Sequence, residues 1–275
     1  MAQRSILITG CSSGIGLASA LTLQARGWRV LATARRPEDL ERLRYEHGLE
    51  VLELELADEI SVRACAARAL ELTDGDLFAL FNNAAFGQVG AVEDLPVSLL
   101  RQQFEVNLFG THELTRAIIP HMRARGRGRI VQCSSVLGLV AAPYRGAYCA
   151  SKFALEGLTD ALRLELAGSG ISVSLIEPGP IRTRFVENAL RRFASTIDID
   201  GSPHARDYRV RLEQMQAGGR QTFKLEPEAV AARLVHAVEA RNPQSRYFVT
   251  TPTFAADIMR RVFPTWLLDR ILRAN

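Results

Sequence analysis

Short apolar runs alternate with longer segments of helical period over the first 180 residues of the chain. Several runs are apolar nearly throughout, which is typical of strands that are covered on both faces. The runs are Ser5–Thr9, Trp28–Thr33, Glu50–Leu56, Leu77–Phe81, Arg129–Cys133 and Ile171–Ile176, and the helical segments are 15–26, 38–47, 59–72, 97–124 and 147–167. This alternation predicts the α/β class, with a doubly wound, Rossmann-type parallel sheet and helices on both faces. Ligands bind such sheets at the carboxyl ends of the strands.

The pattern loosens after this region. Residues 182–222 are rich in arginine and mix isolated apolar residues with glycines, and an insertion of this length is typical of a substrate lid. A last helix is expected after Pro227 and a short strand at Arg246–Thr250. Residues 252–275 form an amphipathic tail, with apolar residues and arginines at helical spacing. We therefore expect a single domain over residues 1–275, with a lid and a C-terminal tail.

Composition limits the classes of function. The 275 residues are 47% hydrophobic and 23% charged, as in ordinary soluble globular proteins. The net charge is +4 and the arginines are spread along the chain, which argues against nucleic acid as a partner. The four cysteines lack metal-ligand spacing, so we expect reduced thiols and no metal. Neither a signal peptide nor an apolar run near the ~18 residues of a membrane span is evident, and we expect a cytoplasmic protein.

A glycine-rich turn directly follows the first predicted strand and opens a helix. Glycines let the backbone turn tightly and approach a pyrophosphate, and the helix N-terminus stabilises its negative charge. In this strand–turn–helix context the turn predicts a dinucleotide site, with a plain tight turn as the alternative. The candidate cofactor-binding residues here are Gly10, Ser12, Ser13, Gly14, Ile15 and Gly16.

The end of the second predicted strand bears on the choice of cofactor. An acidic residue at this place would hold the adenosine ribose hydroxyls, whereas an arginine can pair with a 2′-phosphate. Ala34 cannot bond the ribose through its side chain, and Arg35 and Arg36 follow at once. We therefore expect NADP(H) to be preferred, with NAD(H) possible. The alternative is that one or both arginines are merely solvated, and of the two Arg36 is favoured for this.

Tyr148 and Lys152 are four residues apart in a predicted helix and so point to the same face. A free phenol titrates near pH ~10, and a nearby cation favours the phenolate; the spacing thus supplies an acid–base and a charge that lowers its pKa. Most tyrosine–lysine pairs of this kind simply lie on a helix surface. The chain, however, has 32 arginines and only two lysines, Lys152 and Lys224, which favours a role that needs a compact ammonium.

The order and spacing of several motifs resemble the short-chain dehydrogenase/reductase family over about residues 3–185. The motifs are the glycine turn, Asn82-Asn83-Ala84, Val106-Asn107, Ser134-Ser135, Tyr148-x-x-x-Lys152 and Pro178-Gly179-Pro180-Ile181-Arg182-Thr183. Segments 148–158 and 179–183 look closest to hydroxysteroid and retinol dehydrogenase members of the compact branch. Two positions depart from the family pattern. Ala85 stands where glycine is usual, and Glu55, with Asp58 three residues on, stands where an aspartate is common.

The resemblance implies a role for each catalytic candidate. Tyr148 would exchange a proton with the substrate oxygen, and Lys152 would bind the nicotinamide ribose and lower the pKa of the tyrosine. Ser135 would hydrogen-bond the carbonyl oxygen, with Ser134 as support. Asn107 would bend its helix and hold a water in the proton relay. Simpler alternatives are a turn hydroxyl for Ser135 and a polar surface residue for Asn107.

The same resemblance implies further cofactor contacts. Asn82 and Ala84 would line the adenosine side of the cleft, and Thr183 would bind the nicotinamide amide, although it could also cap a helix. The remaining contacts would come from the loop that contains Pro178, Gly179 and Ile181.

We interpret the chain as an NADP(H)-dependent oxidoreductase that interconverts a ketone or aldehyde and an alcohol. Apolar residues near the expected cleft favour a small hydrophobic substrate such as a steroid, a retinoid, or a long-chain or aromatic carbonyl, unless they only pack the lid. They are Leu137, Leu139, Val140, Tyr144, Phe185 and Phe193. The alternatives are a fatty-acyl or polyketide ketoreductase and a non-catalytic NADP(H)-sensing or scaffold protein.

The resemblance also implies a homodimer or homotetramer built partly on helices 97–124 and 147–167. For the tail, packing over the cleft or a neighbouring subunit is favoured over contact with a membrane surface, which its arginines and Trp266 would also suit.

Overall fold

The computed structural model of the chain describes residues 3–216 and 222–273. Residues 217–221 of the expected lid and the last two residues of the expected tail lie outside these ranges, and so do the side chains of residues 214–216.

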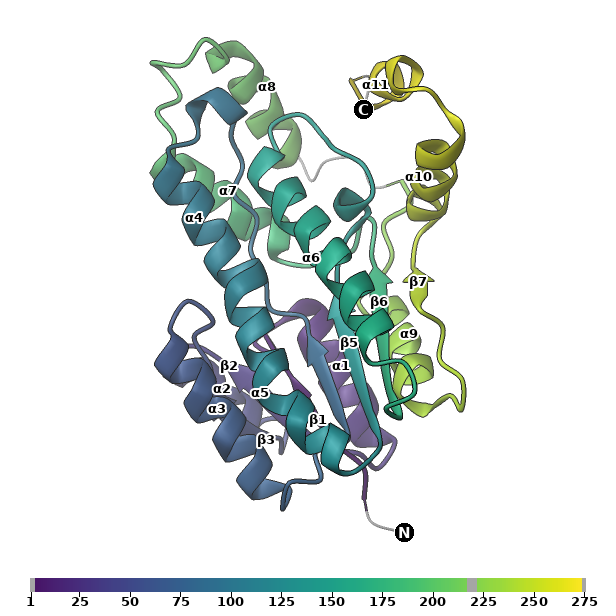
Figure 1. Cartoon of the computed structure of the whole chain (residues 1–275). Helices are drawn as coiled ribbons and strands as arrows, with labels where there is room; N and C mark the ends of the chain where they lie inside the picture. The colour runs from purple at the N-terminus through teal and green to yellow at the C-terminus, as the bar shows by residue number, and fades with distance from the viewer. Residues whose placement is uncertain (1–2, 217–221, 274–275) are drawn as a thin grey trace.

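A seven-stranded parallel sheet forms the centre of the structure, in the order β3-β2-β1-β4-β5-β6-β7 (Figure 1). Its strands are β1 (Ser5–Ile8), β2 (Arg29–Ala34), β3 (Glu50–Glu53), β4 (Ala79–Asn82), β5 (Gly128–Cys133), β6 (Ile171–Glu177) and β7 (Arg246–Phe248). The order reverses between β1 and β4, and in register Ile8 lies opposite Ala32 of β2 and Phe81 of β4. The predicted doubly wound sheet is confirmed, with its switch point at the glycine turn.

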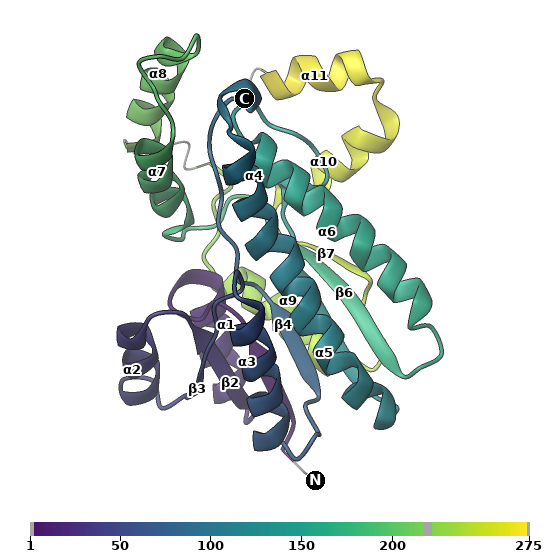
Figure 2. The ribbon, with the colours of Figure 1, turned by 60° about the vertical axis from the view of Figure 1, so that its left-hand side comes forward.

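Helices cover both faces of the sheet, because alternate residues of each strand point to opposite sides. Ile6 and Ile8 of β1 pack in one core with α1 (Gly14–Ala25), α2 (Pro37–Tyr45) and α9 (Glu228–Glu239). Leu7 packs on the other side with α3 (Glu59–Leu72) and α5 (Thr111–Ala124), next to α6 (Gly146–Glu165) (Figures 1 and 2). Because both faces are covered, the strands are apolar nearly throughout.

The helix expected over residues 97–124 is not regular. It consists of α4 (Val97–Phe104), a π-helical segment (Glu105–Gly110) and α5, which follow one another without a break. Such π segments are rare and often occur at functional sites. Here the segment contains Asn107, whose contacts are described with the site.

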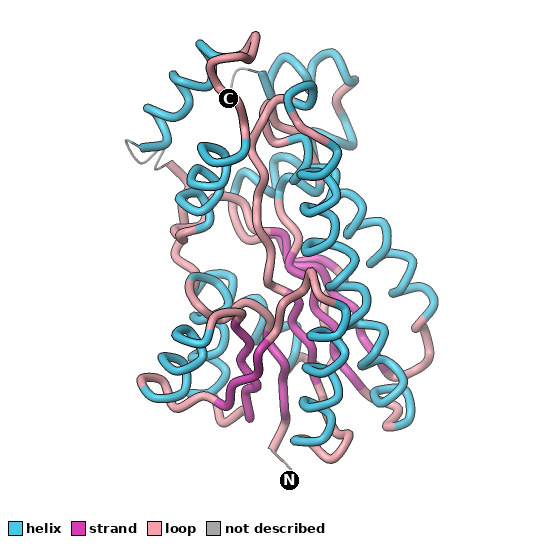
Figure 3. Tube along the Cα trace, turned by 90° about the vertical axis from the view of Figure 1, so that its left-hand side faces the viewer, coloured by secondary structure: helices cyan, strands magenta, loops and turns pink. Residues whose placement is uncertain are grey.

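The remaining helices lie beyond the carboxyl end of the sheet (Figures 2 and 3). The expected lid contains α7 (Phe185–Thr196) and α8 (Ala205–Gln216), and the expected tail is two helices, α10 (Thr251–Val262) and α11 (Thr265–Arg273), with Pro264 between them. In the part of the chain that the structure describes, no helix combines the length and the apolar character needed to cross a membrane.

A small core of its own joins the α7–α8 segment to the body of the protein. Phe193 packs against Tyr208 with ring centroids 4.9 Å apart, and Tyr144 contacts Tyr208 at 5.4 Å. The Tyr208 hydroxyl accepts a hydrogen bond from the backbone N–H of Ala91 and donates one to Asp94. Phe193 and Tyr144 therefore pack this segment, and the expectation that they lie around the substrate is wrong.

Candidate active site

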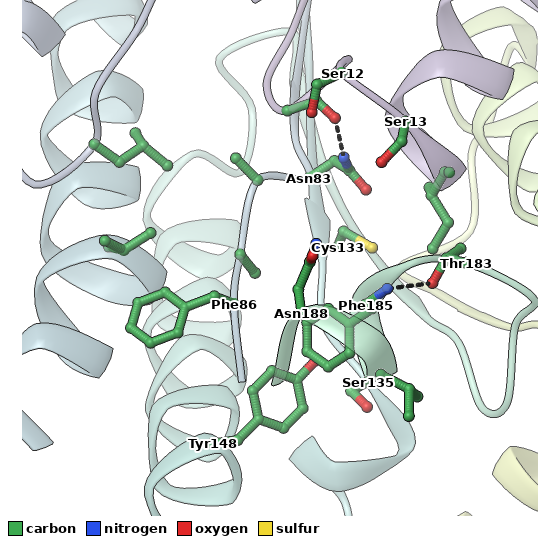
Figure 4. Close-up of a pocket in the computed structure, with 18 of the residues that line it drawn as sticks. Ser12, Ser13, Asn83, Phe86, Cys133, Ser135, Tyr148, Thr183, Phe185 and Asn188 are labelled. Atoms are coloured by element: carbon green, nitrogen blue, oxygen red, sulfur yellow. Dashed lines mark hydrogen bonds between the residues drawn. The ribbon is translucent and has the colours of Figure 1, made fainter. Parts of the chain in front are cut away.

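A cleft of about 1140 Å³ opens at the carboxyl ends of the strands (Figure 4). Its walls come from the turn after β1, the ends of β2 to β6, the start of α6, and α7. Most of the predicted site residues line it: Gly10, Ser12, Ser13, Gly14, Ile15, Arg35, Arg36, Ala84, Ser134, Ser135, Tyr148, Lys152, Pro178, Gly179, Ile181 and Thr183. Gly16, Asn82 and Asn107 lie behind its wall.

The turn after β1 fits a phosphate group. Gly10 has φ of +73°, and a Cβ there would lie 2.9 Å from the Cα of Ala84; a Cβ on Gly16 would lie 2.1 Å from the carbonyl oxygen of Gly10. Side chains are thus excluded where the backbone must approach a ligand closely. Ser13, the N-cap of α1, makes no side-chain cap, and the first turn of the helix holds no carboxylate. The positive end of the helix dipole is therefore available to an anion.

The prediction that Asn82 lines the cleft is wrong for its side chain. Asn82 is the last residue of β4, and its amide donates to the hydroxyl of Thr115 on α5, 2.8 Å away. Asn83 lines the cleft instead, and its amide donates to the carbonyl of Thr9 at 3.0 Å. The Thr9 hydroxyl in turn accepts from the backbone N–H groups of Asn83 and Ala84. The second asparagine of the motif thus supports the glycine turn.

The end of β2 places two arginines in the cleft with different partners. Arg35 is 68% exposed and its Nη1 lies 3.3 Å from Glu55, which also lines the cleft. Arg36 pairs with Asp39 at 2.9 Å. Asp58 does not replace the usual aspartate at the end of β3, because its carboxylate caps α3 by accepting from the N–H of Ile60.

Tyr148 and Lys152 lie on the same face of α6 and both line the cleft, as predicted. The Lys152 Nζ lies 5.7 Å from the centroid of the tyrosine ring and donates to the carbonyl of Cys133 at 2.7 Å. Phe185 of α7 packs against the same ring, with centroids 5.3 Å apart (Figure 4). Cys133 is the acceptor found for Lys152 among the described residues, which leaves two of the three ammonium protons for other acceptors.

The prediction that Lys152 lowers the pKa of Tyr148 is wrong for the protein alone. Burial raises the pKa of Tyr148, and the groups that oppose this rise are the Ser135 hydroxyl and the Arg145 guanidinium. Burial also lowers the pKa of Lys152. Both shifts have one cause, since burial disfavours the charged form of either group. The phenol is therefore protonated at neutral pH and suited to donate a proton.

Ser135 lies at the end of β5 with its hydroxyl in the cleft (Figure 4). Its oxygen accepts from the N–H of Leu137 at 3.1 Å, so Ser135 does serve as a turn hydroxyl, which was the simpler alternative. A hydroxyl that accepts in this way still has its proton to donate. Ser134 points into the space beside Gly138, where Glu156 also lies.

Asn107 is buried, so the surface alternative for it is wrong. Its Oδ1 accepts from the N–H of Phe86 at 3.1 Å, and its Nδ2 donates to the carbonyl of Phe86 at 3.0 Å and to the Ser151 hydroxyl at 3.2 Å. Ser151 donates to the carbonyl of Tyr148 at 2.8 Å. Asn107 therefore joins the π-helical segment to the loop after β4 and to the helix that carries Tyr148.

The loop after β6 closes the remaining side of the cleft. The Pro178 carbonyl accepts from the N–H of Val136 at 2.8 Å, which ties this loop to the turn of Ser135. Ile181 pairs with Leu225 in an isolated parallel bridge. The Thr183 hydroxyl accepts from the N–H of Phe185 at 3.3 Å, just before α7, but the N-cap of that helix is Arg184; Thr183 also lines the cleft, as predicted.

A buried charge network supports the site from behind. Arg246 donates to Glu156 and Glu177 at 2.5 Å each and to Asp160 at 2.7 Å. Glu156 lies one helical turn after Lys152, and Glu177 directly precedes the loop of Pro178. Burial raises the pKa of Glu156 and raises that of Glu177 to about 8. One arginine thus faces two buried carboxyl groups, and one of them holds a proton near neutral pH.

Replacing Glu177 by Gln should stabilise the protein relative to the wild type as the pH rises. The folded protein holds the Glu177 proton up to about pH 8, whereas the unfolded chain releases it near 4.5. Wild-type stability should therefore fall through this window and level off outside it. Each pKa unit of difference is worth about 1.4 kcal/mol. Urea unfolding of E177Q and wild type from pH 4 to 9 measures the difference.

Glu239→Gln is the control of opposite sign. Arg26 and Trp28 hydrogen-bond Glu239, and the bond from Arg26 is the main cause that lowers its pKa. The wild-type advantage over E239Q should be present above the unfolded pKa and vanish as the pH falls. A pH-independent difference between E177Q and wild type would contradict the burial argument.

Comparison with known proteins agrees with this geometry. A family model described as short chain dehydrogenase matches residues 4–192. The chain is 44% identical to the uncharacterized oxidoreductase YbbO of Escherichia coli K12, over 98% of this chain and 94% of that protein. It is 37% identical to human 17-beta-hydroxysteroid dehydrogenase type 1, over 91% and 78% of the two chains.

Solved structures share the fold and carry both nicotinamide cofactors. A short chain dehydrogenase/reductase from Burkholderia phymatum in complex with NAD superposes with a TM-score of 0.79 at 26% identity, over 98% of this chain and 95% of that one. An actinorhodin polyketide ketoreductase variant with NADPH gives a TM-score of 0.72 at 29% identity, over 90% and 95%. The chain therefore belongs to the short-chain dehydrogenase family and is an oxidoreductase that acts on CH–OH and C=O groups.

Proposed function

We propose that the protein is an NADP(H)-dependent oxidoreductase that interconverts a hydrophobic ketone or aldehyde and the corresponding alcohol. The observation that carries the proposal is that one cleft contains the glycine turn at one end and the hydroxyls of Ser135 and Tyr148 at the other. A bound nicotinamide supplies or accepts the hydride at the carbonyl carbon.

The chain's own residues handle the oxygen and the proton. Ser135 donates a hydrogen bond to the carbonyl oxygen, where negative charge develops. Tyr148, protonated at neutral pH, gives its proton to the same oxygen in reduction and takes it back in oxidation. Lys152 holds the nicotinamide ribose with the protons that Cys133 leaves available. Asn107 and Ser151 fix the helix that carries the tyrosine.

Apolar side chains beside Tyr148 support a hydrophobic substrate. Leu137, Ala142, Phe185 and Val186 line the same cleft, and Phe185 packs against the Tyr148 ring. Leu139 and Val140 are buried in the protein and do not line it. The exposed apolar residues Phe109, Leu158 and Leu164 on the long helices support the homodimer or homotetramer that the resemblance implies.

NADP(H) preference rests on Arg35, since its pairing with Glu55 is long and exposed whereas Arg36 is held by Asp39. Arg35→Gln should weaken NADPH binding by about 10–100-fold, because a bond from arginine to a phosphate is worth about 1.5–3 kcal/mol, and should leave NADH unchanged. Arg36→Gln, the control, should change neither by much. The measurement is the initial rate of NADPH and NADH oxidation with a panel of hydrophobic and small polar carbonyl compounds. Wild-type preference for NADH, or no turnover of any carbonyl, would contradict the proposal.

A further inference from the structure

Arg192 of α7 also lines the cleft, and among the described residues no carboxylate pairs with it. Its Nε donates to the Gln88 side-chain oxygen at 2.8 Å, and its Nη2 donates to that of Gln102. Its Cζ lies 4.4 Å from the centroid of the Phe86 ring. All three partners are neutral, and within residues 3–216 and 222–273 no ion pair involves Arg192. Such a guanidinium is fixed in position and has its full charge to offer to an anion.

Arg192 and Arg35 line the same cleft, and the charge of Arg35 acts on Arg192. They belong to segments far apart in the chain, α7 and the end of β2, and both line the same space. Burial lowers the pKa of Arg192, and the charge of Arg35 lowers it further. Two guanidinium groups that repel each other across an open cleft favour an anion between them, and phosphate is the anion that arginine binds best in a bidentate manner.

The neighbouring residue shows that this is not a general property of α7. Arg191 also lines the cleft, but its Nη2 pairs with Glu187 at 2.9 Å and its side chain is 71% exposed. Its charge is therefore neutralised by its own helix and screened by solvent. Of the two adjacent arginines, only Arg192 has its charge directed to the cleft by neutral partners.

The partners of Arg192 are themselves fixed. Gln88 is fully buried; its backbone N–H donates to the Gln103 side chain at 2.7 Å, and its amide donates to the Thr196 hydroxyl of α7 at 3.0 Å. The guanidinium of Arg192 is thus fixed by both α7 and the loop that follows β4. Little conformational entropy is therefore lost when it binds a ligand.

We propose that Arg192 is a second ligand for the 2′-phosphate of NADP(H), so that α7 and the end of β2 clamp this group between them and select NADP(H) over NAD(H). The proposal rests on the proposed use of NADP(H) and adds to it a residue from the expected lid. The other phosphate groups of NADP(H) are those of its pyrophosphate, which NAD(H) also has.

The test is Arg192→Gln in the full-length protein, with the Kd of NADPH and NADH measured in binary complexes by fluorescence titration. We expect the Kd of NADPH to rise at least about 10-fold, as for the loss of one charge-assisted hydrogen bond. The Kd of NADH should change less than about 2-fold. Competition by 2′,5′-ADP should weaken in the same proportion, while that by 5′-ADP should not. Arg192→Lys should retain part of the preference. Arg191→Gln is the matched control and should bind both cofactors like the wild type.

Two outcomes would overturn the clamp. Equal weakening of both cofactors would mean that Arg192 binds the pyrophosphate or only holds α7 in place. Unchanged binding of both would mean that it has no cofactor role. Equal wild-type affinity for NADPH and NADH would instead refute the NADP(H) preference itself, which separates the two failures. Thermal melts of each variant establish that it is folded.

Discussion

Replacing Tyr148 by Phe is expected to lower kcat/KM by about 10²–10⁴-fold, the usual contribution of a positioned acid–base group. The substitution removes the hydroxyl alone, because the ring keeps its contact with Phe185 and its place over Lys152. Cofactor affinity should therefore be unchanged. Steady-state rates and NADPH titration of the same preparation separate the two effects.

Tyr144→Phe provides the control for this prediction. Tyr144 lies four residues earlier, but its hydroxyl donates to Asp207 at 2.7 Å and faces the α7–α8 core. Its loss should change turnover only a few-fold, like that of an ordinary hydrogen bond. If Tyr148→Phe kept wild-type turnover, the proton would come from elsewhere. If neither the wild type nor the variant turned over any carbonyl, the alternative of a cofactor-sensing or scaffold protein would be favoured.

Replacing Arg246 by Met is expected to cost about 3–5 kcal/mol of stability at neutral pH, because it leaves buried carboxyl groups without their cation. Glu177 is fully buried and Glu156 nearly so, and both accept from the same guanidinium. The loss should shrink toward pH 5, because Glu177 already holds its proton and Glu156, the other buried carboxyl group, then takes one up more readily. Urea unfolding at pH 5 and pH 7.5 measures both effects.

The matched control is Arg163→Met on α6. Arg163 pairs with Asp160 at 2.6 Å near the surface, and such pairs are worth about 0–1 kcal/mol. A loss for Arg246→Met as small as that for Arg163→Met would show that the buried network contributes little. Because Glu156 follows Lys152 by one turn, a large loss of stability should be accompanied by weaker cofactor binding.

The strands were predictable because buried parallel strands are apolar along their whole length. Every strand begins within two residues of its expected start, and only β3 ends more than two residues from its expected end. The resemblance predicted that Asn107 bends the long helix, and the structure has a π-helical segment there, in which the Asn107 side chain bonds to the backbone of Phe86. No periodicity in residues 97–124 records that contact.

The site was predictable where a motif fixes one residue and less so where it offers two. Asn82 and Asn83 are the same residue type, so the motif alone does not distinguish them. Strand alternation directs the Asn82 side chain toward Thr115, whereas Asn83 lies in the turn. The predicted direction of the Tyr148 pKa shift was wrong, because sequence spacing shows that Lys152 is near Tyr148 but does not show that both groups are buried. The sequence also held a signal for Arg192. Glu187 lies four residues before Arg191, a spacing at which the two form an ion pair on a helix surface, and this spacing does not pair Glu187 with Arg192.

The cleft also contains both lysines of the chain. Lys152 is 3% exposed and Lys224 lies half-buried on the wall. With arginine supplying the other side-chain cations, an amine-reactive ester has only these two ammonium groups and the terminal amine to acylate. Coupling the protein to a resin through its side-chain amines would therefore obstruct its working face, whereas protection from acylation would report on what occupies it.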